Sequence, residues 1–350
     1  MSEKRKLDDS QSKSENQQQI ISAGDGCDVN VVVSDDSSKK RVKSVEYEHL
    51  FIKNLPSSEA YEKSYMHRDV VYRIVVTSKT DFIITSSVDG CIKFWKKAAY
   101  GIEFVKHFRA HVGNIQHICC NSTGTLLATI SNDKTVKVFD IINFDMINMI
   151  KLNFTPGKCE WIHSAGDPIS ALAVSDLKSS FIYIFDGKGD GSPMNIIEKL
   201  HSVPVSILKY NHVFSTMVSV DTNGMLEYWS SPENDYKFPQ SVVDFQYKIE
   251  TDLFEFVKTK TTPFDLSFSE DGLLFASISS DRKIRIFKFL TGKIVRVFDE
   301  GLQQLQATQQ VKQVLSNVEF ARRMAVEKEL EKSDAFSYQT IKFDSSGYFV

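Results

Sequence analysis

Residues 136–139 read Val-Lys-Val-Phe, a strand pattern with apolar residues at alternate positions and an aromatic residue at its end. The pattern recurs as Ile-Lys-Phe-Trp at 92–95, Ile-Tyr-Ile-Phe at 182–185, Leu-Glu-Tyr-Trp at 226–229 and Ile-Arg-Ile-Phe at 284–287. The first three gaps between the terminal aromatics are 44, 46 and 44 residues. A fixed period of this size indicates an array of similar supersecondary units. Such arrays usually present binding surfaces rather than one catalytic centre, which favours an interaction function.

Polar residues also recur at equal spacing ahead of these aromatics. In four units an Asp or Asn stands six residues before the aromatic, and a Ser or Thr stands four residues before that. In three of the four, a His stands 22 residues before the Asp or Asn. The four sets are His67, Thr85, Asp89 and Trp95; His111, Thr129, Asp133 and Phe139; His201, Ser219, Asn223 and Trp229; and Ser277, Asp281 and Phe287.

These residue types are suited to holding a hairpin together from within. An Asp or Asn in a tight turn hydrogen-bonds its own backbone, and a half-buried imidazole needs a polar partner. A catalytic or metal-binding role is the alternative, but a catalytic set does not repeat with every unit. The third unit has Ser179 at the turn position and lacks the His, and the fifth also lacks the His. We therefore expect fewer internal hydrogen bonds to hold these two units together.

The units resemble WD repeats in their His, their Asp and their terminal Trp. Two units end instead on a Phe-Asp pair, at 139–140 and 185–186. That family forms β-propellers with four antiparallel strands in each blade. The resemblance implies an all-β fold, a WD-repeat β-propeller. We expect five blades over residues 45–300, with residues 51–53 as a strand that closes the ring.

The flanks of this region differ from it in composition. Residues 1–44 are predicted to be disordered, because Ser, Gln, Asp and Lys dominate them and the first aromatic is Tyr47. The basic clusters at 4–6 and 39–41 indicate a nuclear-import signal, the alternative being a solvated tail with balanced charge. Residues 335–350 are predicted to begin a further blade that is cut short at Val350. Because an open propeller exposes strand edges, we expect the sequence to be a piece of a longer protein.

Two insertions are the candidate partner surfaces. The gap between the fourth and fifth aromatics is 58 residues, so an aromatic-rich stretch within 230–260 is predicted to form an extra hairpin. Its aromatics either cap the blade or form an interface. Residues 301–334 have helical spacing and predict an amphipathic insertion that packs on the propeller or is offered to a partner. The candidate partner-binding residues are Trp161, Phe238, Arg322 and Arg323.

Composition and motifs narrow the function classes. The net charge of −3 provides no basic field for nucleic acid. Five cysteines without Cys-x-x-Cys spacing indicate reduced thiols inside the cell. The sequence has no apolar run long enough to span a membrane, and residues 1–44 contain no hydrophobic stretch of the signal-peptide type. Because the common hydrolase, metalloprotease and P-loop motifs are missing, we expect no catalytic residue, no metal, no cofactor and no small-molecule substrate.

Longer stretches carry a more specific resemblance. They include Met-His-Arg-Asp-Val at 66–70, Asn-Phe-Asp-Met-Ile-Asn-Met at 143–149, Cys-Glu-Trp-Ile at 159–162 and Arg-Arg-Met-Ala-Val-Glu at 322–327. Over about residues 45–350 the chain resembles the peptidylprolyl isomerase domain and WD repeat-containing proteins, the WD-repeat cyclophilins. That resemblance implies a nuclear, spliceosome-associated protein whose cyclophilin domain follows the propeller and isomerises X-Pro bonds. No position here matches a cyclophilin motif.

Three hypotheses follow. The first is a protein-interaction module, with spliceosomal protein partners, of a nuclear cyclophilin in pre-mRNA splicing. The second is the N-terminal part of a peptidyl-prolyl cis-trans isomerase whose cyclophilin domain lies beyond Val350, which leaves open whether the whole protein is an enzyme. The third is a generic WD-repeat adaptor unrelated to splicing.

Overall fold

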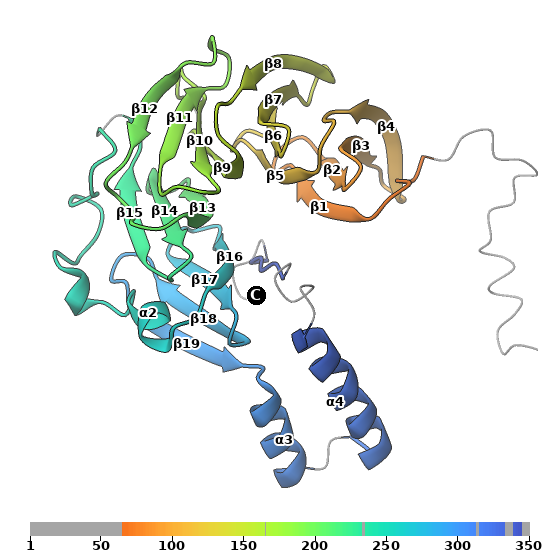
Figure 1. Cartoon of the computed structure of the whole chain (residues 1–350), viewed down its shortest axis with the longest axis vertical. Helices are drawn as coiled ribbons and strands as arrows, with labels where there is room; N and C mark the ends of the chain where they lie inside the picture. The colour runs from red at the N-terminus through yellow and green to blue at the C-terminus, as the bar shows by residue number, and fades with distance from the viewer. Residues whose placement is uncertain (1–64, 165, 233–234, 313–314, 333–338, 345–350) are drawn as a thin grey trace, which may run out of the picture. The chain divides into compact units, whose positions relative to one another are not determined.

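The computed structural model describes residues 65–164, 166–232, 235–312, 315–332 and 339–344. These residues form five antiparallel sheets in succession (Figure 1). The first sheet contains β1 (Val71–Val76), β2 (Phe82–Ser87), β3 (Cys91–Lys97) and β4 (Ile102–Arg109). The second contains β5 (Ile115–Cys120), β6 (Leu126–Ser131), β7 (Thr135–Asp140) and β8 (Asp145–Lys151). The third contains β9 (Pro156–Ile162), β10 (Ala171–Asp176), β11 (Ile182–Asp186) and β12 (Pro193–Ile197).

The fourth sheet has three strands, β13 (Val205–Asn211), β14 (Thr216–Asp221) and β15 (Leu226–Ser230). The fifth contains β16 (Pro263–Phe268), β17 (Leu274–Ser279), β18 (Lys283–Lys288) and β19 (Ile294–Asp299). Each sheet is one blade, so the predicted all-β propeller architecture is confirmed. The expectations for residues 1–44 and 51–53, and most of those for 335–350, lie outside the described residues.

The blades pack face to face through their middle strands. All six residues of β6 are buried, because both faces of a middle strand contact other side chains. Neighbouring blades meet through their first strands, with β1 next to β5, then β9, β13 and β16 in turn. In Figure 1 these five strands lie along the inner side of the row of sheets. The fourth strands β8 and β12 are largely exposed.

The insertion after β15 replaces the missing fourth strand of its blade. Instead of the expected hairpin, its described residues form a 3-10 turn (Lys248–Glu250) and α2 (Glu255–Thr259). Its apolar side chains reach the core of the blade, where Phe245 and Phe256 pack with Tyr228. Lys248 donates a 2.9 Å hydrogen bond to the carbonyl of Leu226 at the strand edge. Side-chain packing therefore covers this edge instead of a paired strand.

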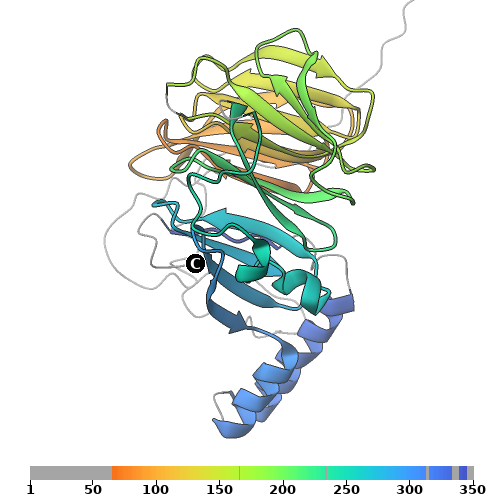
Figure 2. The same cartoon turned by 90° about the vertical axis from the view of Figure 1, so that its left-hand side faces the viewer.

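Two helices follow β19, namely α3 (Leu302–Val311) and α4 (Asn317–Lys332). They lie side by side as a hairpin in both views, dark blue in Figure 2. The side-chain N–H of Gln309 donates to the carbonyl of Leu315 at 2.6 Å, and the backbone N–H of Leu315 donates to the side-chain oxygen of Gln309 at 3.2 Å. These two hydrogen bonds stabilise the connection between the helices. Arg282 of the β17–β18 turn donates to the Glu327 carboxylate at 2.9 Å and to its carbonyl at 3.1 Å. This pair joins the hairpin to the fifth blade.

Residues 339–344 return to the fifth blade beside β16. The backbone N–H of Ile341 donates to Asp265 and that of Phe343 donates to Ser267, both at 3.2 Å. The two apolar side chains are buried in a cluster with Ala276. This segment therefore adds to the apolar core of the blade.

Candidate interaction surfaces and the repeat network

The fourth blade contains a relay of hydrogen bonds between buried side chains. The indole N–H of Trp229 donates to the hydroxyl of Ser219 at 3.2 Å, and that hydroxyl lies 2.7 Å from Nε2 of His201. The opposite ring nitrogen, Nδ1, lies 3.5 Å from the carboxylate of Asp221, which is too long for a well-formed hydrogen bond. The predicted turn residue Asn223 does not hydrogen-bond to the ring; its backbone N–H donates to Asp221 at 3.0 Å.

The second blade has a shorter and tighter version of the relay. Nδ1 of His111 lies 3.1 Å from Asp133 and 3.0 Å from Thr135, and Nε2 lies 2.9 Å from the hydroxyl of Thr129. Burial lowers the pKa of His111 although the carboxylate opposes this. Burial raises the pKa of Asp133, but the hydroxyl of Thr135 and the imidazole outweigh it, so the pKa falls below the usual value. Phe139 has no N–H to donate and packs in the core between the first two blades.

The first blade contains only part of the network. The hydroxyl of Thr85 lies 2.7 Å from Nε2 of His67 and accepts the indole N–H of Trp95 at 2.9 Å. Asp89 accepts the backbone N–H of Cys91 at 3.0 Å and so stabilises the turn between β2 and β3. Nδ1 of His67 is buried without a hydrogen-bond partner among the described residues. The carboxylate and the imidazole are therefore not brought together here.

The fifth blade has no His at the repeat position and uses a buried arginine in its place. Arg285 is only 2% exposed. Its guanidinium donates to Asp281 at 2.5 Å and to Ser279 at 2.6 Å, and it lies 5.0 Å from the ring centre of Phe256. Ser277 donates instead to the carbonyl of Asp265 at 3.2 Å, and Phe287 is fully buried in the core of this blade.

Sequence reasoning missed several members of this network. Asp176 and Asp221 end the second strands of the third and fourth blades, and each accepts backbone N–H groups in the turn that follows. The available signal was an Asp shortly before the expected turn position, two residues before Asn223 and three residues before Ser179. A lysine in the third strand of each of the first two blades was also missed. Lys93 donates to the carbonyls of Tyr65 and Met66, and Lys137 donates to the carbonyl of Ala110.

The repeat residues are therefore used inside the blades. The imidazoles of the network lie against hydroxyls of their own blade. Among the described residues there is no group of three His, Cys, Asp or Glu side chains placed to hold a metal ion. None of the helices in the described ranges has the length and apolar character needed to cross a bilayer.

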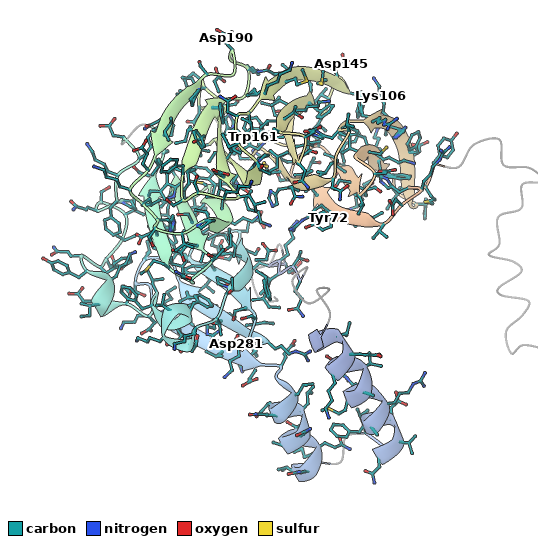
Figure 3. The ribbon with its side chains drawn as sticks, in the orientation of Figure 1. Tyr72, Lys106, Asp145, Trp161, Asp190 and Asp281 are labelled. Carbon is teal, nitrogen blue, oxygen red and sulfur yellow. The ribbon has the colours of Figure 1, made fainter. Side chains whose placement is uncertain are left out.

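The four candidate partner-binding residues differ in their exposure. Trp161 is fully buried (Figure 3), donates its indole N–H to the carbonyl of Cys119 at 3.2 Å, and contacts Gly187 so closely that a Cβ there would lie 2.6 Å from the ring. The structure thus places it in the core, where no partner reaches it. Phe238 is half-buried and packs against the core of the fourth blade. Arg322 and Arg323 are exposed on α4.

The exposed side of α4 combines these arginines with apolar residues. Val318, Val326 and Leu330 are 82%, 50% and 42% exposed. Together with Arg322 they recur every four residues, which places them along one side of the helix. We call Val318, Arg322, Val326 and Leu330 the hairpin surface. Apolar residues exposed in such a row are typical of protein contacts.

Outer strands of neighbouring blades are joined by polar contacts. Lys106 of β4 donates to the carbonyl of Phe144 at 2.9 Å and lies 3.8 Å from the carboxylate of Asp145 (Figure 3). Both charged side chains are well exposed, so the ion pair itself contributes little. The first two blades are thus held by their apolar cores, with this contact at the rim.

Comparison with known proteins agrees with the geometry. The family described as WD domain, G-beta repeat matches residues 62–96 and 102–140. A protein from Mus musculus named "Peptidylprolyl isomerase domain and WD repeat-containing protein 1" is 53% identical over 313 residues, which are 89% of this chain and 48% of that protein. "Peptidyl-prolyl cis-trans isomerase cyp15" of Rhizopus delemar is 49% identical over 90% of this chain and 50% of its own length. "Peptidyl-prolyl cis-trans isomerase CYP71" of Arabidopsis thaliana is 44% identical over 89% and 49%.

The chain spans about half the length of the curated relatives it matches. The identity extends over nearly all of the repeat region, which confirms the resemblance drawn from residues 66–70, 143–149 and 322–327. The blades and the repeat network account for the match to the repeat family. This chain is therefore a WD-repeat protein and a homologue of the peptidylprolyl isomerase domain and WD repeat-containing proteins.

Proposed function

We propose that this chain is the protein-interaction module of a nuclear, spliceosome-associated cyclophilin that acts in pre-mRNA splicing. The observation that carries this proposal is the alignment with proteins named for two parts. The aligned region is 89% of this chain but only 48% of the mouse protein. That region contains the WD-repeat matches. The WD-repeat part thus corresponds to this chain, and its task within such a protein is to bind other proteins.

The geometry supports binding rather than chemistry in the described residues. The polar side chains that repeat along the sequence hold blades together and are not free to act on a substrate. The hairpin surface, by contrast, leaves apolar side chains and Arg322 in solvent. An exposed helix with anchors four residues apart docks readily into a groove of a partner protein. We propose this surface as one contact with spliceosomal proteins.

A second candidate function has a specific observation in its favour. Two relatives are named peptidyl-prolyl cis-trans isomerases and are twice as long as the region they share with this chain. In this alternative, the gene product is an isomerase and residues 1–350 are its non-catalytic part. A generic WD-repeat adaptor outside splicing is the third candidate.

One experiment on paired proteins separates the candidates. The 350-residue chain and the product of the extended transcript are each tested for isomerisation of a proline-containing peptide. Each is also tagged, located in cells and purified with its partners. The proposal would be supported if the short chain lies in the nucleus and is purified with splicing factors. It also requires that isomerase activity is found only in the long product. Activity of the short chain itself would refute a purely binding role, and partners without splicing factors would favour the generic adaptor.

The hairpin surface is tested in the same purification. Arg322→Glu reverses one charge on the surface and Val326→Asp introduces a charge into its apolar row. We expect the double variant to lose splicing factors while keeping its unfolding midpoint, since both side chains are exposed. Lys188→Glu, an exposed site on the third blade, is the matched control. Equal retention of partners by both variants would exclude the hairpin surface as a contact.

A further inference from the structure

The two outer strands of the first blade carry polar side chains on one face. In the ladder between β3 and β4, Cys91 pairs with Arg109, and Lys93 pairs with His107. Alternate residues of a strand point to the same side, so these four side chains share one face, with paired Cβ atoms about 4.5–5.5 Å apart. The intervening Ile92 is buried in the core on the other face. The register of the two strands therefore brings one imidazole and two cationic side chains together.

A cavity of about 500 Å³ lies against this face. The four paired side chains line it together with Met66 and Arg68, which precede β1, and with Asp89 of the turn between β2 and β3. The ring of Tyr65 stacks on that of Phe104 at 4.6 Å between centroids, which holds the start of this segment against β4. We call the space the first-blade cavity. Its volume is in the range typical of ligand sites and exceeds that of a bare inorganic ion.

The first-blade cavity has an excess of positive charge. Arg68, Lys93 and Arg109 contribute three positive charges and Asp89 contributes one negative charge, which leaves +2. None of the ion pairs in the described part of the chain involves these four residues. The carboxylate of Asp89 is already bonded to the backbone of its own turn. The two arginines, both exposed, thus keep their guanidinium groups available at the cavity wall.

The third cation, Lys93, is buried. Its residue is only 7% exposed, and its ammonium group donates to two backbone carbonyls but to no carboxylate of the described ranges. An ammonium group has three donors, so one N–H remains for a further acceptor. Buried charges in proteins are usually paired. A buried cation without a counter-charge in the wall of a cavity points to an anionic ligand.

We propose that the first-blade cavity binds the phosphorylated serine or threonine side chain of a protein partner. A phosphomonoester carries about −1.5 to −2 at neutral pH, which balances the +2 of the cavity, whereas a single carboxylate would leave it positive. The guanidinium groups of Arg68 and Arg109 suit phosphate oxygens, because each donates two parallel hydrogen bonds. The ammonium group of Lys93 supplies a further donor from the buried side.

The volume and the concentration of charge favour a phosphorylated peptide over other phosphates. The cavity has room for the residues beside the phosphorylated one, with Met66 as an apolar wall. A nucleic-acid backbone spreads its charges along its length and is bound by cations in a row, so it matches a local excess of +2 less well. The site lies apart from the hairpin surface, and it concerns any phosphorylated partner whether or not that partner acts in splicing.

The test compares four probes on the full 350-residue chain at one ionic strength. They are a short phosphoserine peptide of otherwise uncharged residues, the same peptide without phosphate, inorganic phosphate, and a single-stranded RNA oligonucleotide. Isothermal titration calorimetry should show the phosphopeptide binding at least about tenfold more tightly than the unphosphorylated peptide, because the charge-assisted hydrogen bonds need the phosphate. It should also bind more tightly than inorganic phosphate and the RNA. Equal binding of the two peptides, or tighter binding of the ion or the RNA, would overturn the proposal.

Two double variants place the binding at the cavity. Arg68→Gln with Arg109→Gln removes two charges from its wall, and Lys96→Gln with Lys97→Gln removes two charges from β3 outside it. All four side chains are exposed, so both variants should keep the unfolding midpoint. The arginine pair should weaken phosphopeptide binding about tenfold or more, and the lysine pair less than about twofold, because exposed charges at a distance are screened. Equal losses would indicate general attraction to a basic blade and would refute a site in the cavity.

Discussion

The hydroxyl of Ser219 joins two buried side chains, and its removal tests whether the repeat network holds the blades together. In Ser219→Ala, Nε2 of His201 and the indole N–H of Trp229 both lose their partner. Each buried polar group left unpaired costs about 1–3 kcal/mol, so the expected loss of unfolding free energy is about 3 kcal/mol. Ser277 occupies the corresponding position in the fifth blade but donates only to the carbonyl of Asp265.

Ser277→Ala is therefore the matched control. Both serines are buried in the second strand of a blade, and both changes remove the same atom. Ser277→Ala should cost about 1 kcal/mol, as expected for one neutral hydrogen bond. Urea unfolding followed by tryptophan fluorescence measures both, with the slope m checked for equality. If the two variants lose the same stability, then the His and Trp contacts of Ser219 contribute nothing, and the account of the network given above fails.

Three further predictions concern single positions. Gly224→Ala should cost more than about 2 kcal/mol, because φ there is 85° and the new Cβ would lie 2.6 Å from a neighbouring side chain. Gly101→Ala, at φ 92° with open space around it, should cost about 1 kcal/mol, and urea unfolding compares the two. Arg285→Met should lower the unfolding free energy by about 3 kcal/mol, because it leaves Asp281 without its cation. In the same assay Arg285→Lys should recover only part of that loss, because a lysine lacks the planar guanidinium group that donates two hydrogen bonds at once. The folded state holds the pKa of His117 well below 6.5, so below that pH unfolding takes up a proton and stability should fall as the pH drops. Urea midpoints measured from about pH 7.5 down to about pH 5 should show this slope, and His117→Gln should flatten it.

The repeat period was enough to predict the blades, because it depends on spacing along the chain. Strands, tight turns and their Asx residues form between neighbours in sequence, so Asp133 and Asp281 were identified from position alone. The same reasoning chose Asn223 in the fourth blade, where the carboxylate nearest the His is that of Asp221. Both residues belong to the same turn, and only the path of the backbone decides which side chain points at His201.

Burial of the long insertions and of single aromatics could not be predicted in the same way. Trp161 and the aromatics after β15 have the composition of an interface, yet Trp161, Phe245 and Phe256 are buried. Phe256 also covers the guanidinium of Arg285, a residue that strand alternation alone would place in solvent. These contacts join residues from different strands and blades, and their partners are distant in sequence.

The sequence by itself determined the number and order of the repeat units and the helical character of residues 301–334, because these follow from local spacing and hydrogen bonding. Only the tertiary structure decided which strand edge the insertion covers and which carboxylate lies near His111 and His201. Those outcomes depend on packing between blades, where side chains compete for the same space and for the same few counter-charges. Local pattern contains no information about that competition. The sequence could therefore name Arg322 as a candidate, but it could not show that Val318, Val326 and Leu330 are exposed along the same side of the helix.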